Sequence, residues 1–380
     1  MKKRIIGGKV LQFAKSYPIV TITGPRQSGK TTLAKMLFPR YRYVNLESLA
    51  DREFAKSDPM SFIRQFSSSR VIIDEVQRVP ELLSQIQVEV DARKGNGRFI
   101  LTGSQNFSLM RGISQSLAGR TALCTLLPFS LGELGSTGQT SLDEILWKGF
   151  YPRIHEEKLN ASDALSFYVD TYLSRDVREV ENVRNLRAFS TFLRLAAGRT
   201  GQVLNVSSLA DDAGVSPKVA SGWLSILEAG YIVRLLQPWH ANINKRLVKA
   251  PKLYFLDVGL ACCLLGITDK SQLAAHPLRG ALFETMVAGE WFKRLANTGD
   301  RSAIYYYRDS NRNEIDLVVQ DGRQTRLCEI KSGATFNPGW TDAMDRLSPQ
   351  FGTDVSRMVV YGGDVSQRRT TFDLRSWREI

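Results

Sequence analysis

Residues 24–31 read Gly24-Pro25-Arg26-Gln27-Ser28-Gly29-Lys30-Thr31, which fits the pattern G-x-x-x-x-G-K-[ST] without a gap. The run 17–23 before it has the composition of a buried strand, and apolar residues recur at helical spacing over 33–37. A strand, a glycine-rich turn and a helix N-terminus together form a cradle of backbone N–H groups for phosphate oxygens. The sequence therefore predicts a phosphate loop, with a fortuitous glycine-rich turn as the alternative.

A second apolar run, residues 71–73, ends in the acids Asp74 and Glu75. Ligands of open parallel sheets bind at the carboxyl edge of the strands, so we expect Asp74 to hold Mg²⁺ through water, beside Thr31. Glu75 follows directly, and the pair suits hydrolysis of ATP better than static nucleotide binding. Surface acids at a strand end are the alternative.

Residues 98–102 form another strand-like run, and Ser104 after it is expected to sense the γ-phosphate. Arg111 and Arg120 follow, and each is a candidate arginine finger in trans, a surface charge or a nucleic-acid contact, with Arg120 the preferred finger. The residues expected to bind ATP and Mg²⁺ are Gly24, Pro25, Arg26, Gln27, Ser28, Gly29, Lys30, Thr31, Thr32, Asp74 and Ser104.

The length and charge of the chain add to this picture. At roughly 150 residues per domain, 380 residues predict two to three compact units, and residues 18–127 alternate strand and helix patterns typical of an α/β parallel sheet. The formal net charge of +13 favours a polyanionic partner, nucleic acid first and anionic membrane second.

Other classes of protein are excluded or disfavoured. Lys9 and Lys15 interrupt any signal-peptide core, and the nearly apolar run 258–267 is far shorter than the roughly 20 residues that span a bilayer. We therefore expect a cytoplasmic protein without a membrane span. The four cysteines and three histidines show no zinc-binding spacing and no disulfide framework.

The middle of the chain has the pattern of a helical connector followed by two helices with a tight turn. Ser216 is expected to cap the second helix and Pro217 to occupy its first position, which is typical of a helix-turn-helix. Strands are predicted at 231–236 and 253–256, and Lys245, Arg246, Lys249 and Lys252 near their connection predict a basic wing. Since the recognition helix offers little beyond Lys218, Ser221 and Ser225, we expect contacts to the DNA backbone; packing or oligomerisation is the alternative.

A predicted hairpin near the C-terminus brings charged side chains together. With residues 321–324 as the turn, Asp316 lies opposite Glu329, and Lys331 points to the same side as Glu329. Ile315, Leu317, Cys328 and Ile330 are expected to share the apolar reverse side. The charged face is either a site or solvent-facing polarity.

Several motifs together resemble a known family. They are the phosphate loop, Asp74-Glu75, Thr102-Gly103-Ser104, Leu117-Ala118-Gly119-Arg120, Leu127-Pro128-Phe129-Ser130, Phe150-Tyr151-Pro152 and Thr171-Tyr172-Leu173-Ser174-Arg175-Asp176-Val177. Over nearly the whole chain the sequence is similar to prokaryotic AAA-type ATPases whose uncharacterised C-terminal domain resembles PD-(D/E)XK nucleases. The resemblance implies an additional-strand ATPase core, with Glu75 as the catalytic glutamate and Arg120 as the finger of a homo-oligomer.

The same resemblance gives the hairpin a metal-dependent chemistry. Asp316 and Glu329 match the acids of the PD-(D/E)XK pattern, Lys331 its lysine, and Glu284 the acidic helix residue of that fold. Carboxylates suit Mg²⁺, with Mn²⁺ as the other candidate ion, and phosphodiester hydrolysis is implied. An active nuclease, a fold retained for DNA binding and a structural domain remain the three alternatives.

The expected organisation is an ATPase domain at 1–135, a connector and winged helix at 136–260, and a nuclease-like α/β domain at 261–380. We expect ATP hydrolysis coupled to action on DNA. A nucleotide-controlled DNA-binding or signalling switch, whose nuclease-like domain is not catalytic, is the alternative.

Overall fold

The computed structural model describes residues 2–104, 116–135, 140–171, 185–240, 250–300, 302–311 and 313–380. The chain forms two compact units: the first comprises 1–129, 229–231 and 296–300, and the second comprises 130–228, 232–295 and 301–380. Most residues of the predicted second and third domains lie in the second unit, together with residues 130–135 of the predicted first domain.

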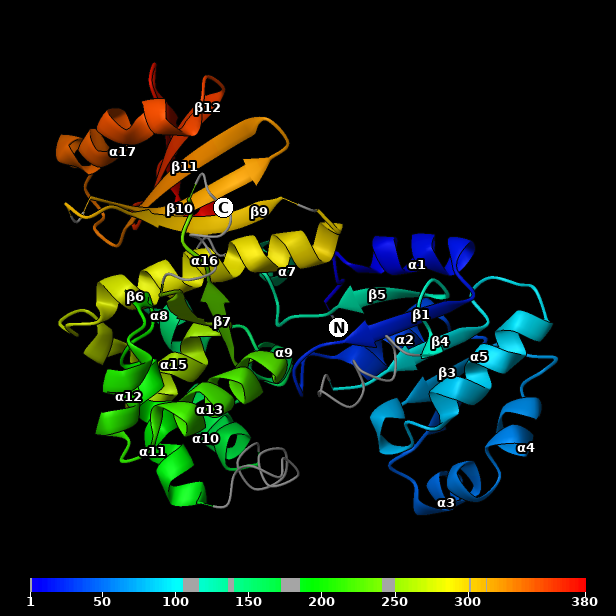
Figure 1. Cartoon of the computed structure of the whole chain (residues 1–380). Coiled ribbons are helices and arrows are strands. Elements are labelled where there is room, and N and C mark those ends of the chain that lie inside the picture. The colour runs from blue at the N-terminus through cyan, green and yellow to red at the C-terminus, as the bar shows by residue number, and fades with distance from the viewer. Residues whose placement is uncertain are drawn as a thin grey trace. The chain divides into compact units, whose positions relative to one another are not determined.

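The first unit is a parallel α/β domain. Its helices are α1 (Gly7–Ser16), α2 (Lys30–Leu37), α3 (Leu49–Ser57), α4 (Pro59–Arg64), α5 (Leu82–Ala92) and the 3₁₀ turn η1 (Val76–Arg78). Its strands are β1 (Ile19–Thr23), β2 (Arg42–Asn45), β3 (Val71–Asp74), β4 (Phe99–Thr102) and β5 (Thr121–Thr125). They lie in the order β2-β3-β4-β1-β5, all parallel. Figure 1 labels β3, β4, β1 and β5 of this sheet. Because β4 lies between β1 and β3, the additional strand implied by the family resemblance is present.

Both faces of this sheet are covered, which explains its continuous apolar strands. Val20 and Ile22 of β1 pack in a cluster that includes residues of α1 and α2. Ile19, the residue before Val20 in the same strand, packs in a second cluster that includes residues of α3, α4 and α5. The alternation of side chains along each strand therefore supplies two cores, one for each face.

The second unit begins with short helices and a small antiparallel sheet. Its helices up to residue 298 are α7 (Leu131–Leu134), α8 (Leu142–Lys148), α9 (Pro152–Glu156), α10 (Ala161–Thr171), α11 (Leu186–Ala197), α12 (Val206–Asp212), α13 (Pro217–Ala229), α15 (Val258–Leu264), the 3₁₀ turn η3 (Lys270–Leu273) and α16 (Arg279–Thr298). The last residue of α13 and the last three residues of α16 belong to the first unit. The strands β6 (Gln202–Val203), β7 (Val233–Leu236) and β8 (Lys252–Phe255) form a sheet in the order β6-β8-β7.

The predicted helix-turn-helix pair corresponds to α12 and α13. Gly214 in the turn has φ +66°, and the Ser216 hydroxyl accepts a hydrogen bond from the Val219 N–H at 3.3 Å, with Pro217 at the first helical position. The strand pair that follows is confirmed as β7 and β8, antiparallel. The wing residues Lys245, Arg246 and Lys249 lie outside the described residues.

A mixed six-stranded sheet forms the rest of this unit. It contains β9 (Ala303–Arg308), β10 (Glu314–Asp321), β11 (Gln324–Lys331), β12 (Val355–Tyr361), β13 (Gln367–Arg368) and β14 (Asp373–Ser376), in the order β13-β14-β12-β11-β10-β9. The helix α17 (Asp342–Leu347) and the 3₁₀ turns η4 (Pro338–Thr341), η5 (Ser348–Phe351) and η6 (Trp377–Glu379) complete it. α17 and η5 pack on one face, where Met344 and Phe351 join the core.

The hairpin of β10 and β11 has the predicted register, since Gln320 pairs with Thr325. The prediction for its reverse side is wrong in one respect. The pairing of β10 with β9 shifts between Ile315 and Val318, so Ile315 joins the same core cluster as Val318. An irregularity of this kind adds one residue to a strand and resets the alternation of its side chains. Ile315 is therefore not placed by simple alternation with Leu317.

Within the described part of the chain, no helix combines the length and apolar character needed to cross a bilayer.

Candidate functional site

The phosphate loop joins β1 to α2 through a backbone that only glycine permits at two positions. Gly24 has φ +149°, and a Cβ atom there would lie 2.1 Å from the Leu126 carbonyl oxygen. Gly29 has φ +91° and immediately precedes α2. Glycine is the residue that adopts such conformations without steric cost. The loop therefore curls tightly at the carboxyl edge of the sheet, at the N-terminus of α2.

The loop presents polar groups suited to a polyphosphate. The Ser28 side chain is fully buried, and its hydroxyl has no hydrogen-bond partner among the described residues. The Lys30 ammonium donates to the carbonyl oxygens of Gly24 at 3.1 Å and Pro25 at 2.8 Å. It is thus held over the cradle, where a polyphosphate would meet it. Of the remaining loop residues, Arg26 is half-buried and Gln27 is exposed with φ +59°.

Asp74 is the meeting point of three hydroxyl groups. The hydroxyls of Thr31 and Tyr43 each donate to its Oδ2 at 2.8 Å, and Thr102 donates to Oδ1. The Asp74 side chain is buried. A carboxylate and a threonine hydroxyl in contact are ligands that Mg²⁺ accepts, so these residues fit the ion that accompanies ATP, and Thr31 and Asp74 would hold it.

Sequence reasoning missed Tyr43 of β2. Although the residue is 36% exposed, partial desolvation raises the pKa of its hydroxyl, and the hydrogen bond to Asp74 adds to the rise. The Lys35 ammonium lies 3.5 Å from the centre of the Tyr43 ring. Tyr43 pairs with Ile72 in the neighbouring strand, but nothing in the local pattern of β2 distinguishes a tyrosine that reaches the site.

Glu75 lies one residue beyond β3 in a strained conformation. It has φ +57° and ψ +42°, which is uncommon for a residue other than glycine. The Gln77 side-chain amide donates to its Oε2. Such outliers cluster at functional sites, where the surrounding structure maintains them. Glu75 is thereby fixed next to Asp74, at the edge where the phosphate loop lies.

The two remaining predicted residues of this unit differ in their surroundings. Ser104 is half-buried just beyond β4, between the ends of β1 and β3 in the sheet order. Arg120 forms a double hydrogen bond with Asp91 of α5, at 2.7 Å and 2.8 Å. Its guanidinium is therefore engaged within its own chain, and action in trans would require it to leave Asp91. Arg111 lies outside the described residues.

The second unit brings together all four residues predicted from the hairpin and α16. Lys331 contacts Glu329 at 2.5 Å and Asp316 at 3.9 Å, while Asp316 Oδ2 accepts the Ile330 N–H at 2.8 Å. Asp316 and Glu329 are buried, which excludes solvent-facing polarity. Burial, with the Asp316 charge as the next cause, raises the pKa of Glu329 to about 8 and that of Glu284 to about 7.

A fifth residue, Lys252 of β8, lies in this cluster and was assigned wrongly to a basic wing. It is 2% exposed, and its ammonium contacts Glu284 at 2.7 Å, Glu314 at 2.5 Å and Asp316 at 3.7 Å. The Tyr254 hydroxyl also donates to Glu284 at 2.5 Å. A buried lysine among carboxylates neutralises them, which a loop-based prediction of a solvated wing could not anticipate.

The carboxylates of this cluster do not fit a divalent cation in the present arrangement. The ammonium of Lys252 lies among Glu284, Glu314 and Asp316, and the ammonium of Lys331 is on Glu329. Across the ranges that the structure describes, no group of three or more acidic, histidine or cysteine side chains has the geometry of a metal site. Glu329 Oε2 is buried and has no hydrogen-bond partner among the same residues.

Comparison with known proteins assigns the chain to a family. A family model described as an AAA domain matches residues 16–135, and two domains of unknown function, DUF8612 and DUF4143, match 139–271 and 279–377. Uncharacterized protein Rv2008c of Mycobacterium tuberculosis and Uncharacterized protein Mb2031c of Mycobacterium bovis are each 32% identical over 332 residues, covering 84% of this chain and 71% of theirs. The chain belongs to their family. Its first domain is an AAA-type P-loop ATPase domain, as predicted.

Solved structures of other proteins are similar to parts of the chain. The Walker-type ATPase PABY2304 of Pyrococcus abyssi is 14% identical, with a TM-score of 0.45 and coverage of 68% of this chain and 94% of that one. AMPPCP-bound DnaA from Aquifex aeolicus is 14% identical, with a TM-score of 0.29 and coverage of 59% and 86%.

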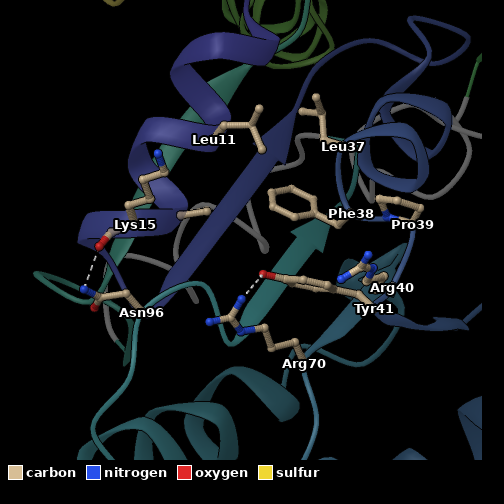
Figure 2. Close-up of a pocket in the computed structure, with 10 residues that line it drawn as sticks. Leu11, Lys15, Leu37, Phe38, Pro39, Arg40, Tyr41, Arg70 and Asn96 are labelled. Carbon is tan, nitrogen blue, oxygen red and sulfur yellow. Dashed lines mark hydrogen bonds between the residues drawn. The ribbon is translucent and has the colours of Figure 1, made fainter.

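The AAA domain also contains a cavity away from the phosphate loop. Its volume is about 540 Å³. Figure 2 shows residues that line it, among them Tyr41, whose hydroxyl accepts a hydrogen bond from Arg70 at 3.4 Å, and Asn96, whose amide donates to the Lys15 carbonyl at 2.8 Å. It is bordered by the last turns of α1 and α2 and by residues that precede β2, β3 and β4. This is the amino edge of the parallel strands, opposite the edge where such sheets bind nucleotides. The cavity is therefore not the ATP site.

Proposed function

We propose that the protein is an AAA-type ATPase that binds DNA through its second unit and couples that binding to hydrolysis at Glu75. The observation that carries the ATPase assignment is the contact between Thr31 and Asp74 beside the Lys30 ammonium. ATP with Mg²⁺ is the expected cofactor. Lys30 would neutralise the outer phosphates, and Glu75 would accept the proton of the attacking water.

Ser104 and Arg120 have supporting parts in this proposal. Ser104, at the end of the strand between β1 and β3, would sense the γ-phosphate. Arg120 would serve a neighbouring subunit of a homo-oligomer after leaving Asp91. Light scattering with and without ATP tests assembly: a monomer under both conditions would remove Arg120 from the mechanism.

DNA as the partner is supported by the charge of the chain and by the exposed side of α13. The net charge is +13, and Lys218, Ser221 and Ser225 are exposed at helical spacing. Small side chains around one lysine let a phosphate backbone approach closely, but they provide few groups that could form hydrogen bonds with base edges and so distinguish one DNA sequence from another. We therefore expect binding that depends on salt and little on sequence, as in a winged helix that contacts the backbone.

The binding proposal is tested by titrating duplex DNA at several salt concentrations. Lys218→Ala should lower the slope of log K against log[salt] by about one, because one phosphate contact is lost. Lys158→Ala removes another exposed lysine of the same unit and serves as the matched control. Equal slopes for all three proteins would show that α13 does not contact DNA.

The C-terminal domain has two candidate functions. The order α16, β9, β10, β11, α17, β12 and the grouping of Asp316, Glu329, Lys331 and Glu284 support a PD-(D/E)XK-like domain that cleaves DNA with Mg²⁺ or Mn²⁺ at Asp316 and Glu329. The position of Lys252 favours the other candidate, a nuclease-like domain that does not cut.

We propose the second candidate, in which the domain belongs to a nucleotide-controlled switch. Linear and circular DNA incubated with Mg²⁺ or Mn²⁺ should stay intact with the parent and with Asp316→Ala. Cleavage by the parent that Asp316→Ala abolishes would establish the nuclease instead.

A further inference from the structure

Lys252 is held in the acidic cluster by its backbone as well as by its side chain. It is the first residue of β8, the middle strand of its sheet, and it pairs with Val203 of β6 and Leu236 of β7. The position of its Cα is therefore fixed from two sides. Lys252 is 2% exposed, so protein groups instead of water surround its ammonium.

Those ligands come from separate elements and converge on one point. Glu284 belongs to α16, whereas Glu314 and Asp316 belong to β10, and their oxygens lie 2.7, 2.5 and 3.7 Å from the Lys252 nitrogen. Three carboxylates around one cation is also how proteins hold a divalent ion. The two nearest distances are those of ammonium–carboxylate hydrogen bonds, so the lysine nitrogen itself occupies the point on which these carboxylates converge.

The electrostatics of the cluster require a cation at this position. Several carboxylates buried together repel one another and lose their hydration, a cost that is offset only by a paired positive charge. Lys331 lies on the Glu329 side of the cluster, at 2.5 Å from Glu329 and 3.9 Å from Asp316. Lys252 supplies the charge on the side of Glu284 and Glu314.

We propose that the Lys252 ammonium is the resident cation of this cluster, on the side of Asp316 that faces Glu284 and Glu314, where it takes the place of a divalent ion such as Mg²⁺ or Mn²⁺. The parent protein then binds no divalent ion there, and a variant without the ammonium acquires the site. The inference concerns the same cluster as the proposed non-cutting domain and gives the physical reason for it.

The test is Mn²⁺ binding to the nucleotide-free protein, followed by calorimetry or by the loss of the free-ion electron paramagnetic resonance signal. Lys252→Met keeps the length of the side chain and removes the charge, so we expect Mn²⁺ affinity to rise by about tenfold or more. Adding Asp316→Asn to this variant should abolish the gain, which locates the ion.

Lys293→Met is the matched control. Lys293 is also 2% exposed, and it pairs with Glu290 on the same helix at 2.8 Å, so its loss also removes a buried ammonium. It should bind Mn²⁺ as the parent does. An equal gain in this control, or no gain in a folded Lys252→Met protein, would overturn the proposal.

The parent supplies a measurement that does not depend on the folding of Lys252→Met. If the parent binds Mn²⁺ at a site that Asp316→Asn abolishes, the proposal is overturned. If the parent has no such site, the result supports the proposal. Phosphate release from ATP, which belongs to the first unit, reports separately on the proposed ATPase.

Discussion

Arg4 provides the sharpest structural prediction for the ATPase domain. Its guanidinium donates to the Ser28 carbonyl of the phosphate loop at 2.8 Å and to the Leu127 carbonyl at 2.5 Å. It also lies 4.8 Å from the centre of the Phe129 ring. Arg4, three residues before the start of α1, thus links the phosphate loop to the segment that follows β5.

The magnitude of the Arg4→Ala effect follows from these contacts. A hydrogen bond from a charged donor contributes about 1.5 kcal/mol or more, and the ring contact contributes about 0.5–1 kcal/mol. Alanine leaves the two carbonyl groups without this donor. We therefore expect the domain to lose about 4 kcal/mol of stability, which lowers its melting temperature by roughly 10–15 °C.

The assay is urea unfolding followed by circular dichroism, combined with ATP binding. Arg4→Lys retains the charge but not the two-pronged geometry, so its loss should be about half as large. ATP affinity should fall in the same order, because the Ser28 carbonyl belongs to the phosphate loop. A free energy of unfolding for Arg4→Ala within about 0.5 kcal/mol of the parent would refute this reasoning.

Three further predictions concern individual groups of the two sites. Glu75→Gln should lower ATP hydrolysis by about 10²–10⁴-fold and leave ATP binding intact, as measured by phosphate release and a fluorescent-nucleotide titration; equal turnover would remove Glu75 from the chemistry. Tyr43→Phe should lower the free energy of unfolding by about 1 kcal/mol through the lost bond to Asp74. Because the pKa of Tyr43 is raised in the folded state, this difference should be constant at neutral pH and shrink above about pH 10, where the unfolded tyrosine ionises. Burial raises the pKa of Glu329 to about 8 and that of Glu284 to about 7, so these two groups bind more protons in the folded protein than in the unfolded chain between about pH 4.5 and pH 8. Their contribution to stability should therefore be lost as the pH rises through this window, and Glu329→Gln should make the pH dependence of thermal unfolding less steeply falling than in the parent; the same pH dependence in both proteins would contradict the assignment.

The ATPase site was largely predictable from local sequence. The glycine spacing of the phosphate loop constrains the backbone directly, and the Asp74 strand places its carboxylate by the rule that parallel strands share one carboxyl edge. Thr31 and Asp74 meet as this rule requires. The hairpin register was predictable for a similar reason, because the turn at 321–324 aligns the two strands.

What the sequence did not reveal depends on contacts between distant segments. No sequence pattern singles out Arg4, which bonds to a carbonyl 123 residues away. Lys252 looked like part of a wing, but it is buried beside Glu284 and Glu314. A lysine or arginine in a polar stretch has the same local pattern whether it is solvated or paired, so only the tertiary structure distinguishes the two. The position of Ile315 depends on a strand irregularity that alternation cannot encode.

The most direct test of the central claim is the rate of phosphate release from ATP and Mg²⁺, with and without DNA, by the parent and Lys30→Ala. Lys56→Ala, an exposed lysine of α3, is the control. We predict turnover by the parent and the control, stimulation by DNA, and background release by Lys30→Ala. Equal rates for parent and Lys30→Ala, or no turnover by the parent under any of these conditions, would contradict an ATPase built on this phosphate loop.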